Sequence, residues 1–359
     1  MIPPAPAISV LPEIHPPASS HLVRAYDFHG LRLTVAAGPE ALAALVARLE
    51  EFPVAGLASS PHLHFDFHPF AEEGSRHVQR PLGAGRIVMD LTAGAVEYFE
   101  ASQQLYVDLG VRGRALAGLR TRRVEVAYPG PDAKSIWLCS HPLFTIPLAE
   151  LLKREGLYMV HAGGLAHAGR GLLVAGASGA GKTTLTLALL RAGFGFLADD
   201  TVFLAQTSKT SPGGDRAQIR VLAFPDEVDL TEQTAGFFPE LRLKPGECRP
   251  EGRPKRAVCA TRLYGVAPEW ECDPAVLLFP KTAPADESVL SDMSKDEALL
   301  QLLCNVVRTD ADASQAHLNA LAMLVQQCDC YRLQTGRDFE ALPGLLRPLL
   351  VGHPARVRP

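Results

Sequence analysis

The feature that most constrains this chain is a glycine-rich segment, GASGAGKT, at residues 176–183. The apolar run Leu172 to Ala175 precedes it, and the segment TTLTLALLRAG, which begins at Thr183 and has apolar residues at helical spacing, runs on from it. The segment is an unbroken match to the pattern G-x-x-x-x-G-K-[ST], in the strand–loop–helix context that this pattern requires. The sequence therefore predicts a phosphate-binding loop between a buried strand and a helix.

The residues of this loop also predict how a phosphate chain is held. Glycines let the backbone curl so that several N–H groups face one anion, and the positive end of the following helix adds to that attraction. Lys182 supplies a positive charge for the terminal phosphates, and the Thr183 hydroxyl is suited to ligate Mg²⁺. We therefore expect ATP and Mg²⁺ as cofactors; the alternative is a glycine-rich turn without a ligand. The expected nucleotide-binding residues are Gly176, Ala177, Ser178, Gly179, Ala180, Gly181, Lys182, Thr183 and Thr184.

Two adjacent carboxylates follow the loop after a short spacing. Asp199 and Asp200 come 17 and 18 residues after Lys182, which leaves room for a helix, a tight turn and a short strand. A right-handed crossover would lay this strand beside the strand of the loop, with its C-terminal end near the phosphates. Carboxylates there can hold Mg²⁺ or accept a proton from an attacking hydroxyl. We expect at least one of them to act in the nucleotide site, the alternative being a polar strand end without a role.

Charge and composition argue against several other classes of protein. The formal net charge of −4 over 359 residues argues against a nucleic-acid partner. The chain has no uninterrupted apolar run of roughly 18 residues or more, so we expect no membrane span and no membrane partner. Seven scattered cysteines without a C-x-x-C pair, behind a proline-broken N-terminus, predict reduced thiols and a cytoplasmic location.

The chain is long enough for two domains. Residues 1–20 are rich in proline and are predicted to be a disordered tail. Residues 21–140 mix strands with one clear helix, which predicts a smaller α+β domain without a catalytic signature of its own. Residues 141–359 alternate helices and strands around the glycine-rich loop and predict an α/β domain.

Two patterns elsewhere raise the question of a bound metal. In the predicted strand HFDFH, His64, Asp66 and His68 would share one face, as metal ligands do, but a half-buried strand shows the same alternation. We favour the half-buried strand. Cys328 and Cys330 are separated by one residue, and we interpret them as core thiols rather than zinc ligands.

A histidine precedes the strand pair that leads into the glycine-rich loop. Alone, His161 is more typical of a satisfied core residue than of a functional one. Taken together, His161, the segment GASGAGKTT and the sequence ADD at 198–200 resemble, at matching spacings, the HPr kinase/phosphorylase family. The sequence LYG at 263–265 is similar to the family's L-F-G, and the resemblance spans roughly 142–282. That family phosphorylates a serine of the small carrier protein HPr and shares its nucleotide-site design with phosphoenolpyruvate carboxykinases.

The resemblance implies an α/β P-loop kinase domain of the HPr kinase/phosphoenolpyruvate carboxykinase type at 141–359, preceded by the smaller α+β domain. Asp199 would be the catalytic base, and Asp200 would hold Mg²⁺ together with Thr183. His161 would lie near the transferred phosphate, and Lys182 would stabilise phosphoryl charge. Members of the family are often oligomeric, so the resemblance leaves a homo-oligomer open.

The chain departs from the family at two places. The sequence KRAVCATRLYG stands where the family has E-R-G-L-G-I-I before its L-F-G, and the family's C-terminal P-G-R-N signature is not recognisable. Both features go with phosphorylase activity and with HPr as the substrate. We therefore expect a divergent paralogue: an ATP-dependent, serine kinase-like phosphotransferase whose partner is a protein or peptide with a serine hydroxyl.

Two other functions stay open at this stage. A kinase of a small hydroxyl compound also places acids soon after its phosphate loop, and the basic segment 242–262 could serve as the Arg-rich lid of such an enzyme. Within or near that segment, Arg262 and Lys281 are candidate phosphate contacts, the alternative being solvated surface charges. A nucleotide-binding regulatory protein without transfer activity is the third reading, against which the intact loop and aspartates argue.

Overall fold

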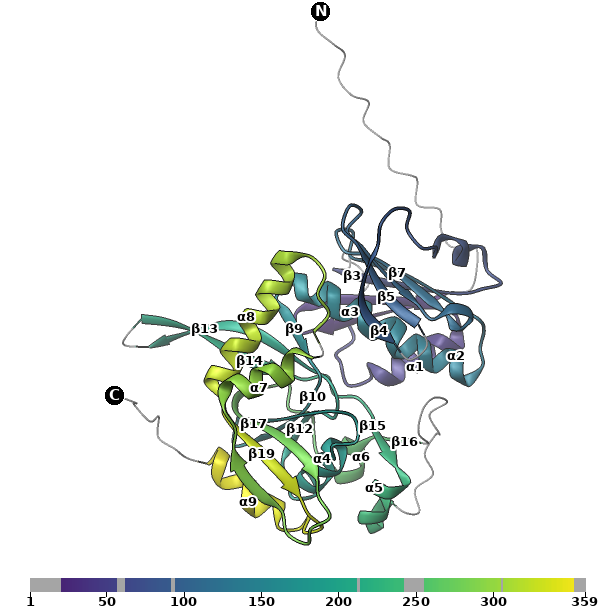
Figure 1. Ribbon diagram of the computed structural model, residues 1–359. Helices are drawn as coiled ribbons and strands as arrows, with labels where there is room; N and C mark the ends of the chain where they lie inside the picture. Colours follow the sequence, from purple (N-terminus) through teal and green to yellow (C-terminus); the bar gives the residue numbers. More distant parts are fainter. Residues whose placement is uncertain are drawn as a thin grey trace, which may run out of the picture.

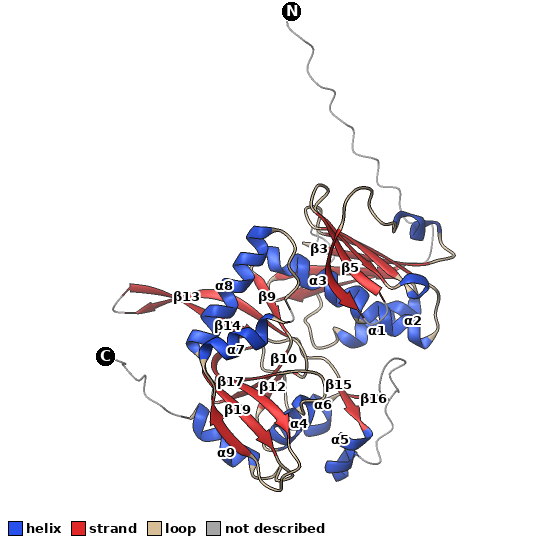
Figure 2. Ribbon diagram, viewed as in Figure 1, coloured by secondary structure: helices blue, strands red, loops and turns tan. Residues whose placement is uncertain are grey.

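The computed structural model describes residues 21–56, 62–91, 94–211, 214–241, 255–304 and 306–351. The predicted disordered tail, and residues 242–254 of the basic segment, lie outside the described residues. Two large sheets organise the described chain, one in each half of the sequence, and helices pack against both (Figures 1 and 2).

The first sheet contains eight strands in the order β1-β2-β3-β8-β7-β6-β5-β4. Its strands are β1 (Leu22–Phe28), β2 (Leu31–Ala37), β3 (Leu63–Pro69), β4 (Arg86–Leu91), β5 (Gly94–Phe99), β6 (Gln104–Asp108), β7 (Arg114–Gly118) and β8 (Arg123–Tyr128). Side chains alternate between the two faces of a strand. In β3, Leu63, Phe65 and Phe67 are fully buried, whereas the polar residues between them are half-buried on the other face.

Three helices cover the buried face of this sheet: α1 (Pro39–Arg48), α2 (Ala133–Ser140) and α3 (Pro142–Arg154). The short η1 (Glu73–His77) contacts β3 and β8, and η2 (Gly110–Arg112) links β6 to β7. Apolar residues of α3, such as Phe144 and Leu148, belong to the core under the first sheet. The boundary predicted between residues 140 and 141 stays a prediction.

Residues 133–154, which span α2 and α3, are long and apolar enough to cross a membrane, with a mean hydropathy of 1.2. Within the protein, however, 67% of an 18-residue stretch of this segment is buried, as is usual for a helix in a protein core. The chain also bends at His141, whose φ and ψ are −112° and −101°, so that the segment forms two helices. The expectation of no membrane partner stays a prediction.

The second sheet contains nine strands. Seven follow the order β12-β10-β11-β17-β14-β13-β9, and β17 also pairs with β19, which in turn pairs with β18. Its strands are β9 (Leu157–Val160), β10 (Ala162–His167), β11 (Arg170–Ala175), β12 (Gly195–Ala198), β13 (Val202–Ser211), β14 (Gly214–Leu222), β17 (Glu271–Thr282), β18 (Val289–Asp292) and β19 (Asp329–Thr335).

Helices cover both faces of this sheet. Leu173 and Leu277 face the core with α7 (Lys295–Leu303) and α8 (Ala311–Gln327). Their neighbours on the same strands face the opposite core with α4 (Lys182–Arg191) and α9 (Leu342–Leu350). Because these strands are buried on both faces, their sequences are continuous apolar runs. The smaller elements are β15 (Val228–Thr231), α5 (Glu232–Phe237), η3 (Pro239–Leu241), β16 (Lys255–Val258) and α6 (Ala260–Tyr264).

The predicted position of the strand before the two aspartates is wrong. We expected β12 beside β11, but β10 lies between them and is antiparallel to both. The hairpin of β10 and β11 supplies the intervening strand, because these two strands are joined directly. Since β11 and β12 still run in the same direction, their C-terminal ends share one edge of the sheet. β11 also pairs in parallel with β17 on its other side.

An aromatic seam joins the cores of the two sheets. The ring of Phe28 stacks on Phe52, with centroids 4.7 Å apart, and meets Phe203 edge-on at 5.5 Å. Phe52 also lies edge-on to Trp270 at 5.3 Å, and Phe224 packs among these rings. Phe28 and Phe52 come from the first half of the chain and the other three from the second. The two halves therefore share buried apolar surface.

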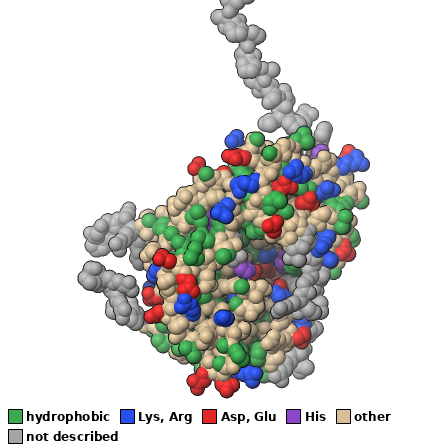
Figure 3. All heavy atoms as spheres, in the orientation of Figure 1, with side chains coloured by type: hydrophobic (Ala, Val, Ile, Leu, Met, Phe, Trp, Pro, Cys, Tyr) green, Lys and Arg blue, Asp and Glu red, His purple; other side chains and the backbone are tan. Residues whose placement is uncertain are grey.

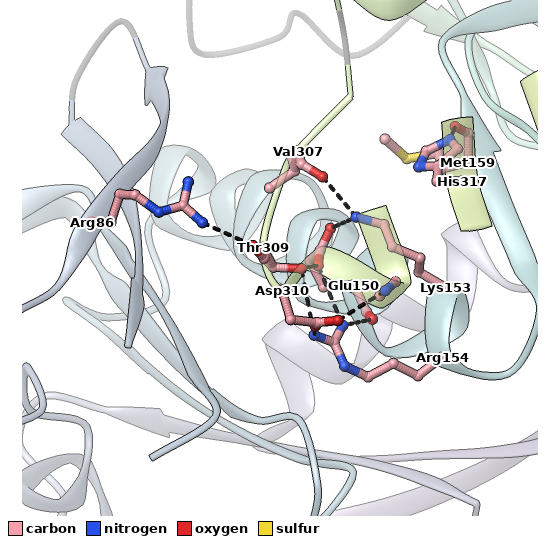
Figure 4. A network of polar contacts seen from close by, with 10 residues as sticks. Arg86, Glu150, Lys153, Arg154, Met159, Val307, Thr309, Asp310 and His317 are labelled. Atoms are coloured by element: carbon pink, nitrogen blue, oxygen red, sulfur yellow. Dashed lines mark hydrogen bonds and ion pairs between the residues drawn. The ribbon is translucent and has the colours of Figure 1, made fainter. Parts of the chain in front are cut away.

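A buried polar network, which we call the Glu150 network, also joins the halves (Figure 4). The Lys153 ammonium donates to the Glu150 carboxylate and, at 2.7 Å, to the carbonyl oxygen of Val307. The Thr309 hydroxyl donates to the other Glu150 oxygen at 2.8 Å, and its carbonyl accepts from Arg86 in β4 at 2.8 Å. Glu150 and Lys153 are 1% and 4% exposed, so their ion pair is desolvated, and Arg154 lies 3.4 Å from the second Glu150 oxygen.

Candidate functional site

The glycine-rich segment joins β11 to α4, and the predicted strand and helix on its two sides are confirmed. Gly179 and Gly181 have φ values of +83° and +96°, a backbone conformation that side chains disfavour. Gly181 is the N-cap residue of α4, so the turn leads directly into the first helical residue, Lys182. The backbone of 176–181 therefore turns at the positive end of a helix. Phosphate binding there stays a prediction.

His161 lies at an interruption in the sheet. β9 pairs with β13, and β10 pairs with β12. Residues 157–166 therefore run antiparallel beside residues 195–205. The register runs from Val160 opposite Val202 to Gly164 opposite Ala198. Between these pairs the strands open, and His161 faces the segment that carries the two aspartates. The strand pair predicted to lead into the glycine-rich loop is thus three strands, β9, β10 and β11, with His161 at the first break.

The two aspartates differ in environment although they are adjacent. Asp199 is 6% exposed, and its Oδ2 accepts a hydrogen bond from the Thr183 hydroxyl at 2.8 Å. Its Oδ1 is buried without a hydrogen-bond partner among the described residues. The Asp200 side chain is 65% exposed, and its Oδ2 lies 3.3 Å from Nδ1 of His161. One carboxylate therefore contacts the loop hydroxyl and the other contacts the histidine.

Lys182 connects the loop to this pair. Its ammonium donates to the carbonyl oxygen of Gly176 at 2.9 Å and lies 3.3 Å from Nε2 of His161. The histidine ring thus stands between Lys182 and Asp200. The structure brings together all the predicted catalytic and metal-ligating residues: His161, Lys182, Thr183, Asp199 and Asp200.

Burial is the main influence on the Asp199 carboxyl. Loss of water, reinforced by the negative charge of Asp200, raises the pKa of Asp199 to about 7. The hydrogen bond from Thr183 and the charge of Lys182 oppose this rise without cancelling it. A carboxyl with this pKa changes its protonation state near neutral pH, as a general base must.

Asp200 shifts in the opposite direction. Partial enclosure raises its pKa, but the hydrogen bond with His161 and the positive charges of Lys182 and Lys255 outweigh that effect. The pKa of Asp200 is therefore lowered overall, and the carboxylate is ionised at neutral pH. The neighbouring pair provides one carboxyl that can exchange a proton and one that stays anionic.

A pocket opens in front of these residues, between the two halves of the chain. Arg48, at the end of α1, and His141, between α2 and α3, form one wall. The Arg48 Nε is 2.8 Å from Oδ2 of Asp226, which lies on the opposite wall. In Figure 3, acidic, basic and histidine side chains gather around a hollow on the face drawn. The remaining lining residues are Thr183, Asp199, Asp200, Thr201, Phe224, Glu227, Asp229 and Lys255.

Sequence reasoning missed several of these pocket residues. Asp226 follows strand β14 in the sequence FPDEVD, so the argument that identified ADD at a strand end applied to it too, whereas Asp229 lies in β15. No local pattern marks Arg48, which reaches the pocket through the packing of α1. Of the candidate phosphate contacts, Arg262 instead pairs with Glu50 at 3.0 Å and does not line the pocket.

Two glycines let the strands approach closely behind the pocket. A Cβ at Gly164 would lie 2.7 Å from Cγ1 of Val202 and 3.0 Å from Cβ of Leu197. A Cβ at Gly163 would lie 3.0 Å from the carbonyl oxygen of Asp199. Any side chain at these positions would push away the strand end that carries the aspartates.

We expect Gly164→Ala to reduce both stability and activity. Overpacking a close strand contact destabilises by roughly 1–3 kcal/mol, and the displaced β12 would carry Asp199 away from Thr183. Gly236→Ala is the matched control, because a Cβ there meets nothing within 4 Å. The measurements are urea unfolding and turnover of ATP. Equal behaviour of the two variants would contradict the close packing.

The site unites an ammonium group, a hydroxyl and two carboxylates at the end of two parallel strands, beside a helix N-terminus. Amide and ammonium donors suit a phosphate chain, and the oxygen groups suit a hard divalent cation such as Mg²⁺. The donor set fits that cation, because the Thr183 hydroxyl and the ionised Asp200 carboxylate are oxygen ligands of the kind that Mg²⁺ prefers. The arrangement thus provides the parts needed for phosphoryl transfer.

Comparison with known proteins adds little to this picture. No protein-family model matches the chain, and no curated protein matches it. Among solved structures, the chain is similar to the HPr(Ser) kinase/phosphatase from Coxiella burnetii, with a TM-score of 0.26 and 12% sequence identity. The match covers 53% of this chain and 92% of that chain.

Proposed function

We propose that this chain is an ATP-dependent kinase that transfers the γ-phosphate to a serine-type hydroxyl of a protein or peptide. The observation that carries the proposal is the convergence of Lys182, Thr183 and the two aspartates at one end of β11 and β12. These residues come from two segments that the sequence separates by a helix. Their meeting beside one polar pocket, which Thr183 and the two aspartates line, is what phosphoryl transfer requires.

In this proposal, each group has a separate task. The backbone of 176–181 and the ammonium of Lys182 bind the terminal phosphates and stabilise their charge. Thr183 and Asp200 hold Mg²⁺, which when bound neutralises charge on the phosphates. His161, between Lys182 and Asp200, orients both and lies near the transferred group.

Asp199 is the proposed general base. Its pKa of about 7 lets it accept a proton near neutral pH, and it lines the pocket that the acceptor hydroxyl would enter. The wall opposite the loop, with Arg48 and Asp226, would position the acceptor. A protein or peptide acceptor would present its serine through the open side of this pocket, whereas a small hydroxyl compound would lie entirely within it.

The test is transfer of label from γ-labelled ATP with Mg²⁺, with the purified protein alone and with host-cell extract. Label in a protein or peptide, absent with Asp199→Asn, would support the proposal and identify the acceptor by mass. Label in a small molecule would instead support a small-molecule kinase. Tight ATP binding without transfer or hydrolysis would favour a regulatory protein and overturn the role of Asp199.

A second variant separates the roles of the two carboxylates. We expect Asp200→Asn to raise the Mg²⁺ concentration needed for half-maximal activity, because it removes an anionic oxygen ligand. Asp199→Asn should leave ATP·Mg²⁺ binding intact while it stops transfer. Titration calorimetry with ATP at several Mg²⁺ concentrations distinguishes them, and the reverse pattern would exchange the two assignments.

A further inference from the structure

Five ionisable side chains gather on the polar face of the first sheet, outside the candidate active site. Their positions come from separate parts of the chain. Asp66 and His68 lie on β3, Glu125 lies on the adjacent β8, Glu72 precedes η1, and His21 precedes β1. We call this group the His21–Glu125 cluster.

The two strands bring like charges together. Asp66 pairs with Glu125 in the parallel register of β3 and β8, so both carboxylates stand on the same face. Like charges directly opposite each other destabilise a sheet. A cation between them removes this repulsion, and the imidazole ring of His68 contacts both carboxylates.

Three of the donors lie together as the ligands of a single ion do, because one atom each of Asp66, His68 and Glu125 lies within 4.8 Å of the other two. His21 Nδ1 lies 3.1 Å from Asp66 Oδ1, and His68 Nε2 lies 3.6 Å from that same oxygen. His68 Nε2 is also 3.0 Å from Glu125 Oε2. Zinc binds nitrogen and oxygen ligands at about 2.0–2.2 Å, so tetrahedral neighbours lie about 3.3 Å apart.

The far nitrogens of both rings face a third carboxylate. Glu72 Oε2 lies 3.0 Å from Nε2 of His21 and 3.8 Å from Nδ1 of His68. Histidines that bind metals commonly donate their other N–H to a carboxylate, which fixes the ring and its tautomer. Glu72 occupies this outer position for His68 and also pairs with the His21 ring.

The rings are also enclosed. The His21 and His68 side chains are 3% and 12% exposed, and their centroids are 5.1 Å apart. A Cβ at Gly74 would lie 2.5 Å from Nδ1 of His68, so the backbone of η1 packs directly against that ring. Protein on several sides therefore holds the donors in place and limits access of water.

We propose that the His21–Glu125 cluster is a zinc site. The ligands are Oδ1 of Asp66, Nε2 of His68 and Oε2 of Glu125, with His21 and Glu72 as the outer groups. One nitrogen and two carboxylate oxygens, without sulfur, suit a borderline divalent ion such as Zn²⁺, with a water as the fourth ligand. The ion would join β3 to β8 directly and, through His21 and Glu72, would hold residue 21 and the η1 region against them.

The site differs from the one considered in the sequence, where His64, Asp66 and His68 were the candidates. His64 is not part of it, because its Nδ1 lies 2.7 Å from the Thr34 hydroxyl. Residues four apart on a strand are separated by roughly 13 Å, so His64 and His68 cannot share one ion. The partners of His68 come instead from the adjacent strand and from distant segments.

The test is zinc binding by the full chain after chelator treatment, with saturating ATP and Mg²⁺ present to occupy the other site. We expect the wild type to bind one more Zn²⁺ per chain than the double variant Asp66→Asn/His68→Gln, by elemental analysis and titration calorimetry. His64→Gln, on the same face of the same strand, should bind as the wild type does. Glu72→Gln should weaken binding by roughly 10–100-fold.

Equal zinc content in the wild type and the double variant would overturn the proposal. So would a wild type that binds no zinc, in which case the cluster is an ion-pair network of protonated histidines. Circular dichroism checks that each variant folds. Substitution with Co²⁺ supplies an independent readout, because its visible spectrum reports tetrahedral nitrogen and oxygen ligands.

Discussion

Asp199→Asn is expected to abolish phosphoryl transfer and, in the ligand-free protein above neutral pH, to raise stability. Loss of a general base lowers turnover by roughly 10²–10⁴-fold. The stability effect has a separate origin, because the buried Asp199 carboxyl must lose its proton in a poorly solvated place near Asp200. An asparagine keeps an oxygen that accepts the hydrogen bond from the Thr183 hydroxyl, and it never carries a negative charge.

The sign of this effect follows from the two pKa values. Asp199 has a pKa of about 7 when folded, against an ordinary value of 3.8. Between these values the folded protein holds the proton more tightly, so stability falls as the pH rises from about 4 to 7. The variant escapes this loss, which is on the order of a few kcal/mol at about 1.4 kcal/mol for each unit of pKa shift.

Thermal unfolding from pH 4 to pH 8 measures the prediction. The stability of the variant relative to the wild type should rise with pH, and this difference should level off above pH 7. Asp200→Asn is the matched control, since the pKa of Asp200 is lowered and its loss should bring no such gain. An Asp199→Asn protein less stable than the wild type at pH 8 would contradict the assigned burial of this charge.

Glu150→Gln should destabilise the protein by roughly 3–5 kcal/mol, the usual effect of breaking a buried ion pair. The Lys153 ammonium would remain 4% exposed with the Val307 carbonyl as its other acceptor, and its charge would be uncompensated. Because Thr309 donates to the same carboxylate, the loop that carries it would also lose a contact. Urea unfolding gives the free-energy difference.

Glu297→Gln supplies the comparison, because Glu297 pairs with Arg332 on the surface, where both side chains are more than one-third exposed. Exposed pairs contribute only about 0–1 kcal/mol. The double variant Glu150→Gln/Lys153→Met should recover much of the loss by removing the stranded charge. If Glu150→Gln cost no more than Glu297→Gln, the Glu150 network would not be desolvated as the structure indicates.

The candidate site was largely predictable from the sequence because its key residues sit in local patterns. The glycine-rich loop, Lys182 and Thr183 form one continuous motif, and Asp199 follows a short apolar strand. The wrong neighbour for β12 came from applying the crossover rule without the preceding hairpin. A hairpin strand can insert between two parallel strands, and no residue in β12 itself reveals this.

Other features depend on contacts between distant segments. Arg48 reaches Asp226 over 178 positions (226 − 48), and His21 meets Asp66 and Glu72 from a distant part of the sequence. Such meetings follow from strand order and register, which a single sequence does not display. Periodicity could place Asp66 and His68 on a face, but it could not supply their partners.

The aromatic seam has a consequence for how a substrate reaches the pocket. Arg48 and His141 stand on one half of the chain and the aspartates on the other, yet Phe28, Phe52 and Phe203 interlock just behind them. Moving the two halves apart would expose these rings to water, which would cost roughly 2 kcal/mol of free energy for each ring. The pocket therefore keeps a fixed width and does not close by a movement of the two halves. In the proposed reaction, an acceptor would have to fit its hydroxyl between walls that are already in place, so its selection would depend on its shape before binding.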